Sequence, residues 1–257
     1  MTAPMHDPAF VAALFDRCAA RYRWWSVAAS FGMVPWWRRI CVGRLMGQRQ
    51  IAALASRTRP DPAPVIADLM AGTGEVWPLI LTELPRAEIR AYDISKEMHA
   101  HAMDRLHRTR ARRISHTAAD VLTEELEPDS VDAVICVFGL KTLDRTQQDR
   151  LAWQIARVLR PGGVFAMIEA SDPTGWALRP LYRLYLDRVL PLIEGLFLRG
   201  AQDFAYLGAY TRAFGDCSHM EGALRRAGLP ASPQSHVFGC ATSLAGRKPV
   251  APVRDGD

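Results

Sequence analysis

The chain has 257 residues, 49% of them hydrophobic, and a formal net charge of +5. This length suits one large α/β domain, with or without a small cap, and the hydrophobic content is ample for a core. No run of eighteen uncharged apolar residues occurs and the N-terminus has neither a basic region nor an apolar signal segment, so we expect a cytoplasmic protein without a transmembrane helix.

The cysteines and histidines do not form a recognisable pattern. No C-x-x-C pair occurs, and the histidines have no metal-ligand spacing, so we expect neither a disulfide framework nor a bound metal. The five cysteines are Cys18, Cys41, Cys136, Cys217 and Cys240.

The first 60 residues differ from the rest in charge. They contain nine arginines against two acidic side chains, whereas the remainder has 23 basic and 25 acidic side chains. Helices are expected at 8–23 and 36–57, so we interpret residues 1–60 as a helical N-terminal cap. Tryptophan accompanies the arginines, which suits peripheral contact with an anionic membrane, although a solvated basic face is the plainer alternative. The four tryptophans are Trp24, Trp25, Trp36 and Trp37.

A short apolar run at 65–70 is typical of a buried parallel strand. Gly72 and Gly74 follow it and allow a tight turn into a helix at 75–84. Strand, glycine turn and helix together form a nucleotide-like site at the carboxyl edge of an open α/β sheet. The turn is not the dinucleotide fingerprint, because Trp77 stands where its third glycine belongs.

The next strand, 89–93, ends in Asp93, close to twenty residues after the turn, where a carboxylate can accept both hydroxyls of a ribose. This pair of features resembles the S-adenosylmethionine (SAM) site of class I methyltransferases. The resemblance implies that Asp68 orients the methionine amine and that Asp120 accepts from the adenine amino group, although capping of loops or helices is the alternative for each carboxylate. The cofactor-binding residues are predicted to be Asp68, Ala71, Gly72, Gly74, Asp93, Ile94, Met98, Asp120, Val121 and Phe138.

The elements that follow alternate as in a mostly parallel sheet with helices on both faces. Strands are expected near 114–118, at 131–137 and at 163–169, with helices at 96–110 and 146–159. A helical, apolar insertion at 172–215 and a helix at 218–227 precede two last strands, near 234–238 and 241–246, which can pair antiparallel. We therefore predict a Rossmann-like domain over 61–250 with seven strands, the last antiparallel, and a short tail at 251–257.

Several motifs resemble the ubiquinone/menaquinone biosynthesis C-methyltransferases over nearly the whole chain. They are Arg157-Val-Leu-Arg-Pro-Gly-Gly163, Asp129-Ser-Val-Asp132, Phe138-Gly-Leu140, Ser30-Phe31-Gly32, Trp37-Arg38, Leu181-Tyr182 and Val189-Leu190-Pro191. The chain departs from the family where acceptor contacts are expected: Arg23 replaces an aspartate, Lys141-Thr142 replaces Arg-Asn, and Ala170 replaces a phenylalanine.

The resemblance implies transfer of a methyl group from SAM to an apolar aromatic acceptor, such as a prenylated quinol. Lys141 is the predicted catalytic residue, as a base or as a cation that stabilises a phenolate, with Tyr22, Tyr182, Tyr185, Tyr206 and Tyr210 as predicted acceptor contacts. Methylation of oxygen, nitrogen or sulfur on another metabolite or lipid stays open, as does a SAM-binding protein that transfers no methyl group. We expect no nucleic-acid partner, and a dimer stays possible.

Overall fold

The computed structural model describes residues 5–48, 63–197 and 205–250. Its centre is a seven-stranded sheet in the order β3-β2-β1-β4-β5-β7-β6. The strands are β1 (Val65–Leu69), β2 (Glu88–Asp93), β3 (Ile114–Ala118), β4 (Val131–Val137), β5 (Leu159–Ala170), β6 (Ala231–His236) and β7 (Ala241–Arg247). Strands β1 to β5 pair in parallel, and β7 runs antiparallel to both β5 and β6, which confirms the predicted fold class.

The helices have clear starting signals where the chain leaves the sheet. Ser95 caps α5 by accepting from the Met98 amide, and Asp144 forms a capping box with Gln147 at the start of α6, since each side chain satisfies amides that the first turn leaves free. The helices are α1 (Pro8–Ala29), α2 (Met33–Met46), α4 (Trp77–Glu83), α5 (Lys96–Thr109), α6 (Arg145–Val158), α7 (Arg179–Leu184), α8 (Leu190–Phe197), α9 (Ala205–Phe214) and α10 (Ser218–Arg226). A π-helical turn, Tyr185–Val189, joins α7 to α8.

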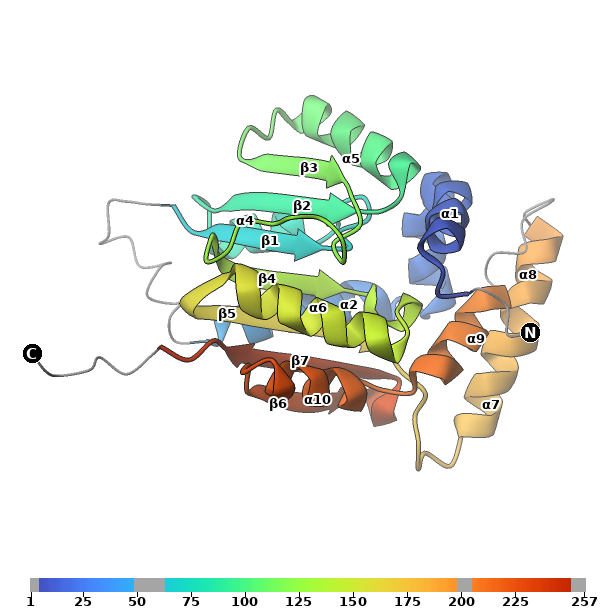
Figure 1. Cartoon of the computed structure of the whole chain (residues 1–257). Helices are drawn as coiled ribbons and strands as arrows, with labels where there is room; N and C mark the ends of the chain where they lie inside the picture. Colours follow the sequence, from blue (N-terminus) through green and yellow to red (C-terminus); the bar gives the residue numbers. More distant parts are fainter. Residues whose placement is uncertain (1–4, 49–62, 198–204, 251–257) are drawn as a thin grey trace, which may run out of the picture.

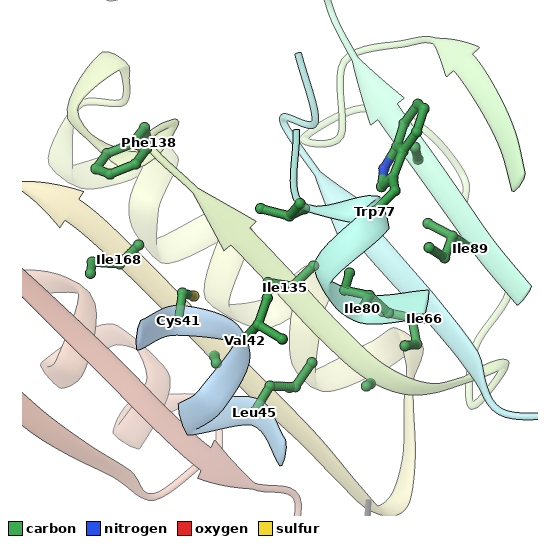
Figure 2. Packing of buried hydrophobic residues seen from close by; sticks show 14 of the residues in the cluster. Cys41, Val42, Leu45, Ile66, Trp77, Ile80, Ile89, Ile135, Phe138 and Ile168 are labelled. Atoms are coloured by element: carbon green, nitrogen blue, oxygen red, sulfur yellow. The ribbon is translucent and has the colours of Figure 1, made fainter. Parts of the chain in front are cut away.

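Helices cover both faces of the sheet because alternate strand residues point to opposite sides. On one face α2, α4 and α5 pack against Ile66, Ile135 and Ile168, and Figure 2 shows Cys41, Val42 and Leu45 of α2 lying across these strands. On the other face α6 and α10 pack against the alternate residues. The buried strand β1, paired on both sides, therefore lies at the centre of the core.

A further group of helices lies beyond the carboxyl ends of the strands. Figure 1 shows α1 and the insertion helices α7, α8 and α9 gathered at this end of the molecule. Ala29 of α1 packs with Leu186 and Leu190 of the insertion in a small buried cluster. The predicted ligand-binding edge of the sheet is thus roofed by segments from both ends of the sequence.

Some predicted boundaries are wrong. The first helix continues to Ala29, beyond the predicted end at 23. Helix α2 ends at Met46, where the Gly47 amide donates to the Gly43 carbonyl and the Gln48 amide donates to the Leu45 carbonyl. Its predicted continuation is therefore wrong at 47 and 48, and residues 49–57 are outside the described part. The Pro161-Gly162-Gly163 turn lies inside β5 rather than before it, since Gly162 takes a φ of 81° at an irregularity in the β4–β5 register.

Candidate functional site

Two adjoining pockets open at the carboxyl edge of the sheet. The first is a cavity of about 80 Å³ bounded by α1 and the loops after β1 to β4, and the second, of about 290 Å³, lies between α1, α2 and the insertion. Phe15, Tyr22, Phe138 and Thr142 line both. Two ligands, one in each pocket, would meet at this boundary.

Nine of the ten residues predicted to bind the cofactor line the first pocket. They are Asp68, Ala71, Gly72, Asp93, Ile94, Met98, Asp120, Val121 and Phe138. Gly74 is the exception. Its φ is 79°, and a Cβ atom there would lie 2.3 Å from the Trp77 ring. Gly74 is therefore required for the packing under the turn, apart from any contact with a ligand.

Asp93, at the end of β2, links two loops of the first pocket. Its Oδ2 atom accepts from the Gly72 amide at 2.8 Å, and its Oδ1 atom accepts from the Ser95 amide at 2.9 Å. Burial raises the pKa of the Asp93 carboxyl to about 6, because a low-dielectric surrounding disfavours the charge. The carboxylate is thus held at the pocket wall, and each oxygen keeps further capacity to accept.

Asp68, at the end of β1, is held by a residue that was expected only to interrupt a motif. The Trp77 indole Nε1 donates to Asp68 Oδ2 at 2.9 Å. Burial raises the pKa of the Asp68 carboxyl to about 8. A carboxylate that lines the pocket and is oriented by one neutral donor suits a bound cation such as an ammonium group.

The loop after β3 supplies the other end of the pocket. Asp120 Oδ1 accepts from the Leu122 amide at 2.9 Å, which fixes the carboxylate in its loop. Met98 and Val121 are buried and, with Ile94, contribute apolar wall. Apolar walls beside a fixed acceptor suit a flat heteroaromatic ring with an amino group.

Backbone strain marks the boundary between the pockets. Met70 and Phe138, which follow β1 and β4, have φ values of 58° and 65°. Gly139 makes this approach possible, since a Cβ there would lie 2.6 Å from the Met70 Cβ. Strained non-glycine residues of this kind concentrate at functional sites.

Lys141 lies in the second pocket and is buried, not on the surface of a loop. Its Nζ atom is 2.6 Å from Glu169 Oε1, and its backbone amide donates to Glu169 Oε2 at 3.1 Å. The Nζ atom also lies 5.8 Å from the centre of the Phe138 ring. The two residues are 28 apart in sequence, but Lys141 follows β4 and Glu169 lies near the end of β5, the neighbouring parallel strand. The predicted order of the strands could therefore have indicated that they pair.

All five predicted acceptor tyrosines line the second pocket. The Tyr185 hydroxyl donates to the Ala29 carbonyl at 3.2 Å, and the Tyr210 hydroxyl donates to the Met5 carbonyl. In the described part of the chain nothing hydrogen-bonds the hydroxyls of Tyr22 and Tyr182, and burial raises the pKa of both, so they stay neutral donors. Tyr206 packs edge-on against Phe10 of α1 at 5.2 Å.

Two charged residues of the first pocket were missed. Arg38 and Glu75 are buried there with a nitrogen to oxygen distance of 3.8 Å. Both could have been predicted from the sequence, because Arg38 is part of the Trp37-Arg38 family motif and Glu75 directly follows Gly74 of the turn. The contribution of α1, through Val11 and Phe15, has no such local signal, because it depends on how that helix folds over the sheet edge.

The tryptophans predicted to form a membrane-contacting surface differ in exposure. Trp37 is buried, whereas Trp36 is 46% exposed. The side chains of Trp24 and Trp25 are outside the described part of the structure. No helix among the described residues is long and apolar enough to cross a bilayer, and residues 5–48, 63–197 and 205–250 contain no group of three potential metal-ligating side chains.

An open parallel sheet with a glycine turn after β1, a pocket-lining acid after β2 and one antiparallel strand at β7 defines a class I SAM-dependent methyltransferase. The mainly apolar second pocket fits an apolar small molecule as the methyl acceptor. The chain belongs to the ubiE/COQ5 methyltransferase family, whose model matches residues 4–248.

Individual proteins agree with this membership. The chain is 34% identical over 216 residues to a ubiquinone/menaquinone biosynthesis C-methyltransferase UbiE of Syntrophotalea carbinolica, covering 84% of each chain. It is 28% identical to a demethylmenaquinone methyltransferase of Thermus thermophilus, covering 92% of this chain and 100% of the relative. An O-methyltransferase family protein from Burkholderia thailandensis shares the fold, with a TM-score of 0.57 at 17% identity over 91% of this chain and 62% of that one.

Proposed function

We propose that the protein methylates a ring carbon of a prenylated quinol. The relatives' names point to this class of acceptor. The observation that carries the proposal is the second pocket. It is wide and apolar, and Lys141, which is paired with the buried Glu169, lines it beside Phe138 at the boundary with the first pocket. An isoprenoid tail suits the apolar wall, and a ring hydroxyl suits the ammonium group.

In the first pocket, we assign the chain's own residues to the parts of SAM. Asp93 would accept from the ribose hydroxyls, Asp68 would orient the methionine amine, and Asp120 would accept from the adenine amine. SAM supplies an activated methyl group on a sulfonium. The boundary residues Tyr22 and Phe138 would face that group and keep water from it.

Carbon methylation needs electron density on the ring, which a quinol gains when a hydroxyl loses its proton. Lys141 is paired with a carboxylate, so we assign it to stabilising the phenolate rather than to accepting the proton. As the new carbon–carbon bond forms, the carbon–sulfur bond breaks. The hydrogen on the methylated carbon then leaves as a proton to solvent, the ring regains its aromaticity and the phenolate oxygen is reprotonated, so that one proton is released for each methyl group transferred.

The direct test offers the purified protein a reduced demethylated prenyl naphthoquinol with methyl-labelled SAM under anaerobic conditions. We expect a product that gains one methyl group on the ring and loses one aromatic ring proton, read by mass spectrometry and NMR. A methoxy product would replace the proposal with O-methylation. No product, with SAM binding intact, would remove this acceptor.

Lys141→Met tests the assigned cation. We expect turnover to fall by at least about a hundredfold at unchanged SAM affinity, since a buried cation stabilises the developing charge. Removing one partner of a buried pair also destabilises the fold, so Lys141→Met/Glu169→Gln serves as the matched control. Recovery of both melting temperature and turnover in the double variant would reduce Lys141 to a structural role.

We further propose that the acceptor enters from a membrane surface through the insertion. Ten large hydrophobic side chains are exposed in the described part of the structure, and five of them lie on the insertion. Two more contact aromatic residues that line the second pocket: Phe31 lies 4.5 Å from the Tyr185 ring, and Phe238 stacks on Trp176 at 5.4 Å. The five are Leu178, Leu181, Leu184, Val189 and Leu192. We call these seven side chains the entrance rim.

Charge supports a bilayer as the partner of the entrance rim. Arg188 is exposed on the π-helical turn, while the neighbouring Asp187 is paired with Arg212. Arg39 is exposed on α2 beside Trp36. Exposed apolar side chains together with exposed arginines suit an anionic lipid surface.

Sedimentation with vesicles containing anionic phospholipid tests this surface. Leu181→Ser/Leu184→Ser should bind about tenfold more weakly, because two leucines lose their contact with lipid, while activity on a short-chain acceptor in solution stays unchanged. Trp153→Ser, which alters a 60% exposed side chain on α6, should bind like the wild type. Equal binding by all three proteins would contradict the entrance rim.

A further inference from the structure

The glycine turn of the cofactor pocket is held from outside by side chains of α5 and β3. Three consecutive carbonyl oxygens accept hydrogen bonds there: His116 Nε2 lies 3.1 Å from the Gly72 oxygen, and Arg105 Nη1 donates to the Thr73 and Gly74 oxygens at 3.1 and 3.0 Å. We call Arg105 and His116 the clasp. Every carbonyl of the turn from 72 to 74 is therefore fixed by a side chain far from it in sequence.

Fixing the carbonyls fixes the amides as well. In a planar trans peptide the C=O and N–H groups point in opposite directions, so the clasp also sets the direction of the amides of Thr73 and Glu75. The Gly74 amide is already taken, since it donates to the Ala71 carbonyl at 3.1 Å. The Gly72 amide is fixed separately, by Asp93 Oδ2. Glycine loses more conformational entropy on ordering than any other residue. Because the clasp already orders this turn in the free protein, the ligand does not have to order it on binding.

Trp77 connects the two parts of the clasp. The Arg105 guanidinium lies 5.9 Å from the centre of the Trp77 ring, and the His116 ring meets the same side chain edge-on at 5.9 Å. The Trp77 indole in turn donates to Asp68. The clasp, the floor under Gly74 and the pocket acid at the end of β1 thus form one connected group.

The protonation of His116 follows from its contacts. A carbonyl oxygen only accepts, so the Nε2 atom that faces Gly72 carries hydrogen. The other ring nitrogen, Nδ1, is 2.9 Å from His99 Nδ1, so neutral His116 accepts there from His99. Burial lowers the pKa of His116 to about 4, which keeps it neutral near pH 7.

We propose that Arg105 and His116 are positioning residues for SAM: by holding the carbonyls of the glycine turn from behind, they preset its amides for the cofactor and so raise SAM affinity without contacting the acceptor. The proposal rests on the first pocket being the SAM pocket, and not on the identity of the acceptor. Neither side chain lines either pocket, which separates this role from direct binding.

Calorimetric SAM titration without any acceptor tests the clasp. Arg105→Met keeps the aliphatic stem on Trp77 but removes both hydrogen bonds, and we expect the SAM Kd to rise about tenfold. His116→Phe should raise it several-fold, and His116→Gln, which keeps a donor, should recover most of the loss. The acceptor KM at saturating SAM should stay unchanged in all three variants.

Arg113→Met is the matched control for a merely structural effect. Arg113 Nη1 donates to the Arg86 carbonyl at 2.9 Å, a bond of the same kind on residues that line neither pocket. We expect an unchanged SAM Kd for this variant even if its melting temperature falls. An unchanged Kd in folded Arg105→Met, or an equal rise in Arg113→Met, would overturn the proposal. Failure of quinol methylation would leave it standing, because no acceptor enters the titration.

Discussion

The two pockets meet at Phe138 but are built in different ways. In the first, polar groups from the ends of β1 and β2 satisfy one another: Asp93 accepts from the Gly72 amide, and Asp68 accepts from Trp77. In the second, the Trp37 Nε1 and Thr211 Oγ1 atoms are buried and have no hydrogen-bond partner among the described residues. The first pocket is therefore built mainly from the ends of the strands and their loops, whereas the wall of the second comes mainly from helices, with Lys141 and Ala170 added from the ends of β4 and β5.

This difference has a consequence for how the enzyme can change. The core packing that positions the first pocket involves β1, β2 and α4, and alterations there disturb the fold. The walls of the second pocket come largely from α1, α2 and α9, and substitutions on α1 and α9 leave the sheet unaltered. Of the departures from the family, Lys141, Thr142 and Ala170 line the second pocket, where variation costs the fold least, whereas Arg23 is exposed and lines neither pocket.

The largest effect is expected at the first pocket. Asp93→Ala removes a carboxylate that would accept from two ribose hydroxyls, and charge-assisted bonds of this kind contribute about 1.5–3 kcal/mol each. The SAM Kd should rise by at least about a hundredfold, measured by calorimetry on protein whose fold is checked by circular dichroism. A Kd within threefold of the wild type would transfer ribose recognition to another residue.

Substitutions at Gly74, below the first pocket, and at Gly32, between α1 and α2, separate the effect of packing on stability from that of backbone conformation. Gly74 and Gly32 have nearly equal φ values, 79° and 78°, but a Cβ would clash with the Trp77 ring at Gly74 and meet nothing within 4 Å at Gly32. Gly74→Ala should cost about 3 kcal/mol of unfolding free energy through strain and overpacking, and Gly32→Ala about 1 kcal/mol through strain alone. Urea denaturation measures both. Equal losses would mean that Trp77 can move aside.

The pH dependence of SAM affinity follows from Asp93. Its pKa is raised to about 6 by burial, and the ionised form is the one that accepts from hydroxyls. The part of SAM affinity that depends on Asp93 should therefore be lost as pH falls through 6, by about tenfold between pH 7 and pH 5. Asp68, whose pKa burial raises to about 8, should add a second loss that begins at higher pH. Calorimetry in buffers of different ionisation enthalpy should also detect proton release on binding near pH 6. A Kd that is constant over this range would contradict the assignment.

Folding responds with the opposite sign. Because the pKa of Asp93 in the folded protein is above the unfolded value of about 4, its contribution to stability is fully present below pH 4 and lost as pH rises through 6. At neutral pH the first pocket thus contains an ionised Asp93 carboxylate, whose charge lowers the stability of the folded protein. Asp93→Asn should remove this part of the pH dependence of the free protein's stability.

The first pocket was far more predictable from sequence than the second. The apolar run at β1, the glycine turn and Asp93 are local signals with fixed spacing. Together with the family resemblance they predicted ten cofactor-binding residues, nine of which line the first pocket. The five tyrosines were placed near the acceptor through family resemblance, because helical spacing alone does not distinguish a pocket wall from a core. The Glu169 partner of Lys141 and the α1 wall depend on contacts between distant segments, for which no local pattern exists.

The smallest predicted effect distinguishes two tyrosines of the second pocket. The Tyr185 hydroxyl already donates to Ala29, whereas no described residue hydrogen-bonds the Tyr182 hydroxyl. Tyr185→Phe should therefore lower the unfolding free energy by about 1 kcal/mol at unchanged acceptor KM, because it removes a bond of the folded state. Tyr182→Phe should leave stability unchanged and raise the acceptor KM about threefold, because its neutral hydroxyl is free to donate to a ring oxygen. If Tyr185→Phe rather than Tyr182→Phe raises the acceptor KM, the ring lies nearer Tyr185, on the Phe31 side of the pocket.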